Sequence, residues 1–159
     1  MPMSMKTEGL EELSGMLAQL GDKAEDVATG ALYDGAGVVA DAFSRAVANI
    51  RTEPFKYKKA HRLPSPEEKA ALAGKTGIAK FNKNGTEVDT LVGVTRSAGH
   101  VKLGSRETPV LEIARSINSG TSFMTKQPIF RRAASSSKRE AENTMIEKAE
   151  QMLQEIIGD

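Results

Sequence analysis

Residues 22–50 read DKAEDVATGALYDGAGVVADAFSRAVANI, and this stretch predicts a long amphipathic helix. Its apolar residues recur at spacings of three and four, which gathers them on one face of a helix. They are Ala24, Val27, Ala28, Ala31, Leu32, Val38, Val39, Ala42, Phe43, Ala46, Val47 and Ile50. Gly30, Gly35 and Gly37 lie in the same stretch, where each costs roughly 1 kcal/mol relative to Ala. We therefore expect close packing against a sheet or another helix here, in preference to the approach of a ligand.

Shorter elements are predicted on both sides of this helix. Upstream, an apolar face predicts a first helix that ends at Gly21, after a loose N-terminus at residues 1–6. That face consists of Leu10, Leu13, Met16, Leu17 and Leu20. Downstream, Pro54 stops the long helix, and residues 54–64 are expected to form an exposed basic loop. A capped start and a glycine stop then predict a short helix over residues 66–73.

An Asn-Gly pair gives the clearest strand signal in the chain. Asn84 and Gly85 supply the positive φ that a tight hairpin turn needs. Two short apolar runs flank them, at residues 78–81 and 88–94. The pattern therefore predicts a β-hairpin at this point.

The remaining residues are predicted to be mainly helical. Thr108 and Pro109 open a short helix that closes before Gly120, and Pro128 begins a last helix whose apolar stripe runs almost to the end. Helices, a hairpin and helices again, without βαβ alternation, are typical of an α+β fold. We expect a single domain over residues 1–159, in which a small antiparallel sheet with a β-hairpin packs against a long helix from each half of the chain.

Charge is unevenly spread along a chain whose formal net charge is only +1. Residues 7–26 are acidic, whereas residues 51–63 and 126–139 are basic. Clusters of Lys and Arg can neutralise nucleic-acid phosphates without reading sequence, so the basic blocks allow contact with nucleic acid. The near-neutral total and the lack of a helix-turn-helix or RNA-binding signature favour other uses.

The sequence carries no signature of catalysis or of a cofactor site. His61 and His100 have no His, Cys or carboxylate neighbour at ligand spacing, and the chain has no cysteine, so we expect neither a metal site nor a disulfide. A Gly-x-Ser-x-Gly elbow and a phosphate-binding glycine loop are both missing. No apolar run approaches the roughly 20 residues that span a bilayer, and no secretion signal is recognisable. We expect a soluble, non-enzymatic protein without catalytic residues, metal or cofactor.

The predicted last helix carries charges that its own dipole disfavours. Arg131 and Arg132 lie in its first turn, where the macrodipole prefers acids, while Glu147, Glu150 and Glu155 crowd its end. A sequence tolerates such a pattern when the charges serve a partner. Our hypothesis is that Arg131 or Arg132 forms an intersubunit ion pair with the acidic block near the N-terminus.

Residues 117–134, INSGTSFMTKQPIFRRAA, resemble a pattern in the tail-completion (minor tail, neck) proteins of long-tailed bacteriophages. The shared pattern is Gly-Thr-Ser, a short spacer and then Pro-apolar-aromatic-x-x-Ala. Other parts agree in order: Gly9-Leu10-Glu11-Glu12-Leu13 in the first helix, the long Ala/Val-rich helix, Thr76-Gly77 before a strand, and Leu91-Val92-Gly93-Val94 in its partner strand. The resemblance thus covers most of the chain.

The same stretch has a physical interpretation of its own. Gly120 permits a tight exit from the preceding helix, Thr121 and Ser122 can satisfy local backbone groups, and Pro128 presets the next helix. Phe123 and Met124 lie between, in an otherwise polar connector. They either cover the end of the core or dock on a neighbouring subunit.

The resemblance implies a virion protein, made in the host bacterial cytoplasm, that forms a ring, with a hexamer as the expectation. The ring would lie at the neck or the head-proximal tail end, and would complete the tail or join it to the head. Its expected partners are further copies of itself and tail-tube, tail-terminator or head-tail connector proteins, with no membrane. The candidate interface residues are Gly120, Thr121, Phe123, Met124, Arg131 and Arg132.

The basic loop offers a second set of candidate residues, which are Lys56, Lys58, Lys59 and Arg62. In a ring, this loop could line a channel, grip a neighbour or touch passing DNA. The alternative function is a small nucleic-acid-binding or regulatory protein that uses residues 51–63 and 126–139.

Overall fold

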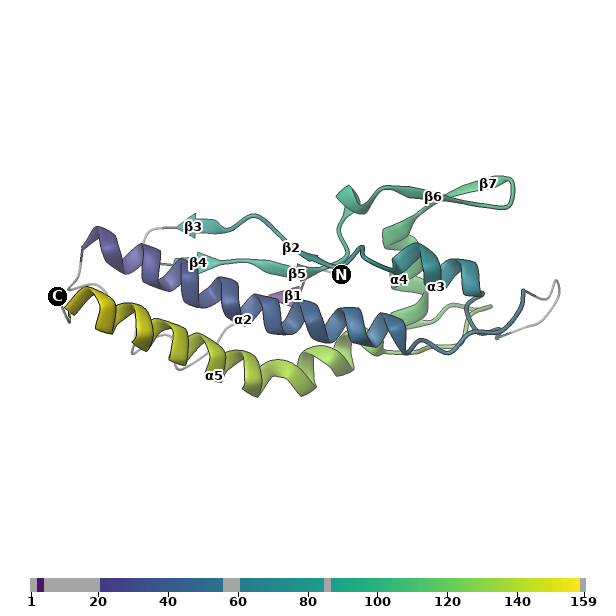
Figure 1. Cartoon of the computed structure of the whole chain (residues 1–159). Coiled ribbons are helices and arrows are strands. Elements are labelled where there is room, and N and C mark those ends of the chain that lie inside the picture. Colours follow the sequence, from purple (N-terminus) through teal and green to yellow (C-terminus); the bar gives the residue numbers. More distant parts are fainter. Residues whose placement is uncertain (1–2, 5–20, 56–60, 85–86, 158–159) are drawn as a thin grey trace. The chain divides into compact units, whose positions relative to one another are not determined.

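Two long helices, α2 (Asp22–Ala48) and α5 (Ile129–Ile157), are the main elements of the structure (Figure 1). The computed structural model describes residues 3–4, 21–55, 61–84 and 87–157. The shorter helices are α3 (Pro66–Leu72), α4 (Val110–Ser119) and the 3-10 turn η1 (Arg96–Ala98). Four of these helices, α2 to α5, lie where apolar periodicity and capping residues predict them, because both signals are local in the chain.

Short strands make up the β part. The strands β1 (Met3–Ser4), β5 (Leu91–Gly93) and β2 (Gly77–Ile78) form one sheet in the order β1-β5-β2. Two hairpins are formed by β3 (Asn82–Asn84) with β4 (Glu87–Asp89), and by β6 (His100–Leu103) with β7 (Arg106–Pro109). The predicted α+β class is confirmed.

The hairpin predicted at Asn84-Gly85 is present. Asn84 pairs with Glu87 in antiparallel register, so two residues, both outside the described ranges, connect the strands. The ladder is interrupted before it reaches β2 and β5. At this interruption the Thr90 hydroxyl donates to the Ala79 carbonyl at 2.8 Å, and the Ala79 N–H donates to Leu91 O at 2.7 Å.

Three features differ from the predictions or lie beyond them. The hairpin β6–β7 was not predicted, although Gly104, with φ +65°, and Ser105 form a two-residue connection of a common type. Met3–Ser4 form strand β1 where a loose N-terminus was expected. The predicted first helix lies outside the described residues.

The chain divides into two compact units, and the division falls within both long helices. Unit 1 comprises residues 1–2, 40–77 and 93–136. Unit 2 comprises residues 3–39, 78–92 and 137–159. The two are described separately below.

In unit 2, α2 packs closely against α5 through small residues. A Cβ atom on Gly30 would lie 2.8 Å from Met152 Sδ, and one on Gly35 would lie 2.7 Å from Met145 Cε. The close packing predicted for these glycines is confirmed, whereas Gly37 has no atom within 4 Å of such a position. The buried residues are Val27, Ala31, Leu32, Ala36, Val39, Val92, Ala141, Met145 and Ala149.

In unit 1, aromatic stacking joins the two helices. The Phe43 and Phe130 rings lie 5.1 Å apart at 58°, a tilted arrangement typical of buried aromatic pairs. Around them Leu72, Val94 and Ile117 are buried. The core of this unit therefore fixes the start of α5, and the site described next depends on that position.

Candidate functional site

The connector between α4 and α5 is a closed loop. Its base is closed by the Gln127 N–H, which donates to the Ile117 carbonyl at 2.8 Å. Gly120 ends α4 with φ +74°, and a Cβ there would lie 2.9 Å from Lys126 Cβ, so this position requires glycine. The role predicted for Gly120 from sequence is therefore confirmed.

Thr121 organises the tip of this connector. Its Oγ1 accepts the Met124 N–H at 3.0 Å and the Phe123 N–H at 3.3 Å, while its own N–H donates to Met124 O at 3.0 Å. The prediction that side chains of this connector satisfy local backbone groups is confirmed for Thr121, whereas for Ser122 it stays a prediction. These bonds hold the backbone of Phe123 and Met124 in place.

Phe123 and Met124, predicted as a pair, have opposite surroundings. The Phe123 side chain is 54% exposed, whereas Met124 is only 3% exposed and belongs to the core. The candidate interface position of Met124 is therefore wrong, because its side chain fills the inside of the connector. Phe123 stays a candidate contact residue.

The exit of the connector is fixed by a side chain from α4. The Phe130 N–H donates to Asn118 Oδ1 at 3.2 Å, which satisfies one of the free backbone donors at the start of α5. The Arg132 N–H donates to the Pro128 carbonyl at 3.0 Å, within the first turn. Arg131 and Arg132 are thereby placed on the first turn of α5, and both side chains are exposed.

The segment after α2 is joined to this connector at two points. The Gln127 amide bonds both ways with the Arg51 backbone, accepting from its N–H and donating to its carbonyl, each at 3.1 Å. Further along, the Arg62 N–H donates to Phe123 O and the Thr125 N–H donates to Arg62 O, each at 2.9 Å. The two basic blocks of the sequence therefore meet in unit 1.

Arg62 has a structural role that the sequence did not predict. Its guanidinium lies 2.8 Å from the Glu68 carboxylate, and the two side chains are only 13% and 8% exposed. The expectation of an exposed loop residue is therefore wrong for Arg62, because it neutralises a buried acid. The other candidates of that loop, Lys56, Lys58 and Lys59, lie outside the described residues.

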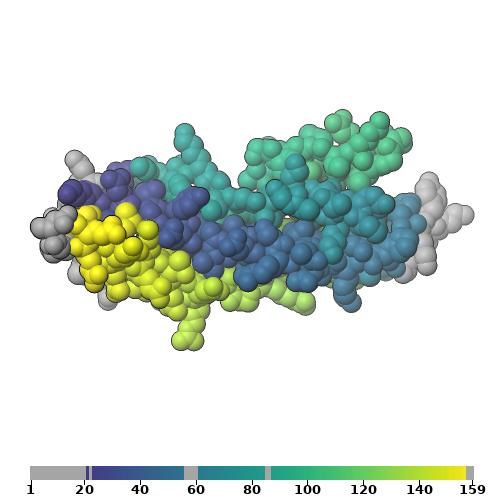
Figure 2. Space-filling view, viewed as in Figure 1, coloured from purple at the N-terminus to yellow at the C-terminus, as the bar shows by residue number. Residues whose placement is uncertain are grey.

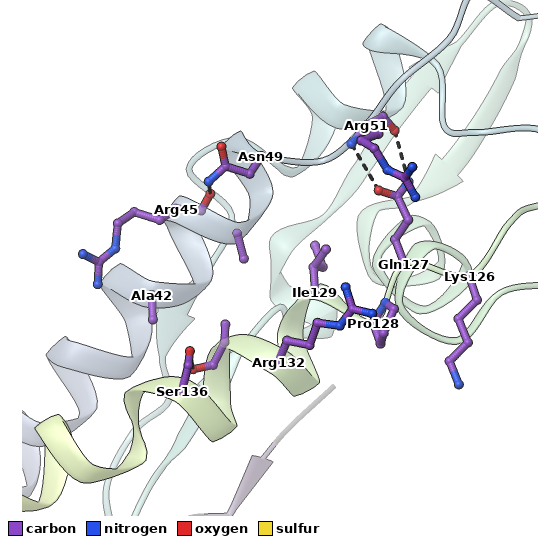
Figure 3. A pocket seen from close by; sticks show the side chains of 12 residues that line it. Ala42, Arg45, Asn49, Arg51, Lys126, Gln127, Pro128, Ile129, Arg132 and Ser136 are labelled. Carbon is purple, nitrogen blue, oxygen red and sulfur yellow. Dashed lines mark hydrogen bonds between the residues drawn. The ribbon is translucent and has the colours of Figure 1, made fainter.

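A pocket of about 560 Å³ lies between the end of α2 and the start of α5 (Figure 3). We call it the basic pocket, because Arg45, Arg51, Lys126 and Arg132 line it and no acid does. Its other lining residues are Ala42, Ala46, Asn49, Gln127, Pro128, Ile129, Ala133 and Ser136. In Figure 3, Arg45 lies on the α2 side and Arg132 on the α5 side, with Arg51 and Lys126 near the connector. Arg131 lines a shallower hollow that shares Lys126 and Arg132 with it.

The four cations of the basic pocket are exposed, and within the described ranges none of their side chains forms an ion pair. Like charges that share a pocket repel each other, so their potential favours an anionic partner. The acidic block suggested from sequence lies largely outside the described ranges. Its residue Glu25 is paired with Lys83, whose pKa it raises by accepting a hydrogen bond. The intersubunit pairing of Arg131 or Arg132 stays a prediction.

Sequence patterns alone would not have found this pocket. Arg45 lies outside both basic blocks, and Gln127 gave no signal in the sequence, although it is the residue that brings Arg51 to the connector.

Among the described residues, no group of three or more His, Cys, Asp or Glu side chains could hold a metal ion. Within the same ranges, none of the helices combines the length and apolar character of a membrane span. Scans against protein-family models, curated proteins and solved structures found no match for the chain.

Proposed function

We propose that this chain is a non-enzymatic structural protein of a long-tailed phage, which forms a ring at the neck or the head-proximal tail end. In this position it completes the tail or joins it to the head. The observation that carries the proposal is the connector of residues 117–134, which resembles the tail-completion pattern and holds Phe123 on the surface in a closed, hydrogen-bonded loop.

The geometry of the connector suits a protein contact. An aromatic side chain has few rotatable bonds, and when its backbone is already held in place it loses little conformational entropy on binding. The basic pocket of the same unit adds a charged surface, which gives an assembly its orientation. Aromatic residues are enriched at subunit interfaces, whose rims are polar.

The first test is the assembly state of the full chain. Size-exclusion chromatography with light scattering should give one defined oligomer at low salt, and electron microscopy of the same fraction should show rings. Phe123→Ser should shift the protein towards the monomer. Phe123→Tyr keeps the aromatic side chain, so this variant should assemble like the wild type. A wild-type protein that stays monomeric at every concentration would overturn the proposal.

The second test concerns the phage itself. Deletion of the gene from its phage or prophage should yield heads and tails that remain unjoined or tails with abnormal ends. Wild-type protein supplied in trans should restore joined particles, and the Phe123→Ser variant should not. Normal infectious particles from the deletion strain would refute the proposed role.

One observation favours a second candidate, a nucleic-acid-binding protein. Residues from both basic blocks, Arg51 and Arg132 among them, border the same pocket. Non-specific binding to phosphates weakens steeply with salt, because counterions are released. A monomer that binds random duplex DNA tightly at low salt, and loses that binding in moderate salt, would favour this candidate over the ring.

A further inference from the structure

The two units carry charges of opposite sign. Among the described residues, unit 1 contains 12 Lys and Arg against 6 Asp and Glu, whereas unit 2 contains 6 against 11. The formal charge of +1 for the whole chain therefore hides a strongly basic and a strongly acidic part. Such a charge distribution attracts the basic part of one molecule to the acidic part of another.

The acidic part has an exposed row of carboxylates on α5. Glu140, Glu147 and Glu150 are exposed on the side of the helix that faces away from the buried Ala141, Met145 and Ala149, and we call them the acidic stripe. Within the described residues none of the three forms an ion pair, whereas other acids of unit 2, such as Glu142 and Asp34, pair with lysines. In Figure 2 the last turns of α5, in yellow, lie at the surface beside the first turns of α2, in purple.

The basic pocket is suited to glutamate side chains, which carry a carboxylate on apolar methylene groups. Ala42, Ala46, Pro128, Ile129 and Ala133 give it an apolar lining, and the cations lie around this lining. The methylene groups of a Glu side chain can cover such a surface while its carboxylate reaches a guanidinium. The polar amides of the pocket are already engaged, since Asn49 donates to Arg45 O and Gln127 bonds with the Arg51 backbone, so they offer little to nucleic-acid bases.

We infer that the basic pocket of one molecule binds the acidic stripe of a second copy, so that subunits join head to tail. The units carry net charges of opposite sign, so the acidic stripe of a second molecule is the complementary partner of the pocket. A head-to-tail contact uses two different surfaces and closes into a ring when its rotation allows. The inference therefore rests on the proposed ring and supplies its subunit contact.

The test uses two charge-reversed variants of the full chain. The pocket variant carries Arg45→Glu and Arg132→Glu, one change at the end of α2 and one at the start of α5, so that their opposite effects on the helix dipoles offset each other. The stripe variant carries Glu147→Lys and Glu150→Lys. The matched controls change the same number of exposed charges elsewhere in each unit: Arg96→Glu with Arg106→Glu in unit 1, and Glu87→Lys with Asp89→Lys in unit 2.

Light scattering over a concentration series, at low and high salt, is the measurement, with circular dichroism to check that each variant is folded. Each reversed variant alone should need roughly tenfold or more protein to assemble than the wild type, and the controls should not. An equal mixture of the two variants should regain assembly, because a native stripe then meets a native pocket and a reversed stripe meets a reversed pocket.

Three results would overturn the inference in distinguishable ways. If the wild type assembles and the pocket and stripe variants assemble equally well, the ring stands but its contact lies elsewhere. If each variant alone is impaired and the mixture fails to recover, the pocket and stripe do not bind each other. If only the pocket variant changes, and what it loses is salt-sensitive binding to random duplex DNA, the pocket binds phosphates. A monomeric wild type would instead remove the proposed function itself.

Discussion

Alanine at Gly35 and at Gly37 should have opposite effects on stability, although the two positions are two residues apart on α2. In a helix interior, replacing Gly with Ala raises the free energy of unfolding by about 1 kcal/mol. At Gly37 nothing lies within 4 Å of the new methyl group, so Gly37→Ala should show this whole increase in the free energy of unfolding. At Gly35 the methyl group would lie 2.7 Å from Met145 Cε and closer still to Cγ. Overpacking costs about 1–3 kcal/mol, which exceeds the gain in helix propensity. Gly35→Ala should therefore lower the free energy of unfolding by up to about 2 kcal/mol.

Gly30→Ala should fall between these two variants. Its nearest neighbour is Met152 Sδ at 2.8 Å, in the outer part of a flexible side chain that can rotate away. Urea unfolding followed by far-ultraviolet circular dichroism, at one protein concentration, measures all three variants against the wild type. In thermal scans, Gly37→Ala should raise the midpoint by about 2–4 °C. If Gly35→Ala proved as stabilising as Gly37→Ala, the close packing of α2 on α5 in unit 2 would be refuted.

Three further predictions concern the site. Phe123→Ser should weaken assembly in light scattering, yet leave the unfolding midpoint unchanged at a dilution where the wild type is also monomeric, as exposed substitutions usually do; a large loss of monomer stability would contradict its place outside the core. Arg62→Ala should lower the free energy of unfolding by about 3 kcal/mol in urea titrations, because it leaves the buried carboxylate of Glu68 without its cation, and a neutral result would refute that ion pair's role. Arg131→Gln and Arg132→Gln should each raise the free energy of unfolding by about 0.3–1 kcal/mol, since both remove a cation from a helix start; destabilisation would show that these cations are already neutralised.

The helices could be predicted because their signals are local. Ser65 illustrates this: its hydroxyl accepts the Glu68 N–H at 3.2 Å at the start of α3, as the capping pattern predicts. Pro128 likewise precedes α5 directly, and the run of serines in α5 does not interrupt the helix. Periodicity and caps lie within a few residues of the structure they produce, so no tertiary information is needed.

The hairpin β6–β7 was missed for a physical reason. Its strands, His100–Leu103 and Arg106–Pro109, are largely exposed and polar, so the alternation that marks a half-buried strand is weak. The only local signal was Gly104-Ser105 between two short runs. A hairpin that buries little is difficult to recognise from hydrophobic pattern alone.

The site could be predicted only in part, because it depends on contacts between distant segments. The exit at Gly120 and the bonds of Thr121 follow from local chemistry. The separation of Phe123 from Met124 does not, since neighbouring residues in a connector share the same sequence context. The meeting of Arg51 with Lys126 required the Gln127 side chain to bond with a backbone 76 residues away.

The charges of α5 acquire a consistent explanation when its two ends belong to different contacts. In an isolated molecule, Arg131 and Arg132 lie at the positive end of the helix dipole, and Glu155 lies at the negative end, so both ends are destabilised. In a head-to-tail contact, the acidic end of one α5 and its negative dipole approach the basic start of another, which turns both penalties into attraction. Salt should therefore act in opposite directions: it screens the repulsion within a monomer and stabilises its fold, while it weakens the contact between molecules. A protein whose fold is stabilised by salt and whose assembly is dissociated by it would combine both effects in one helix.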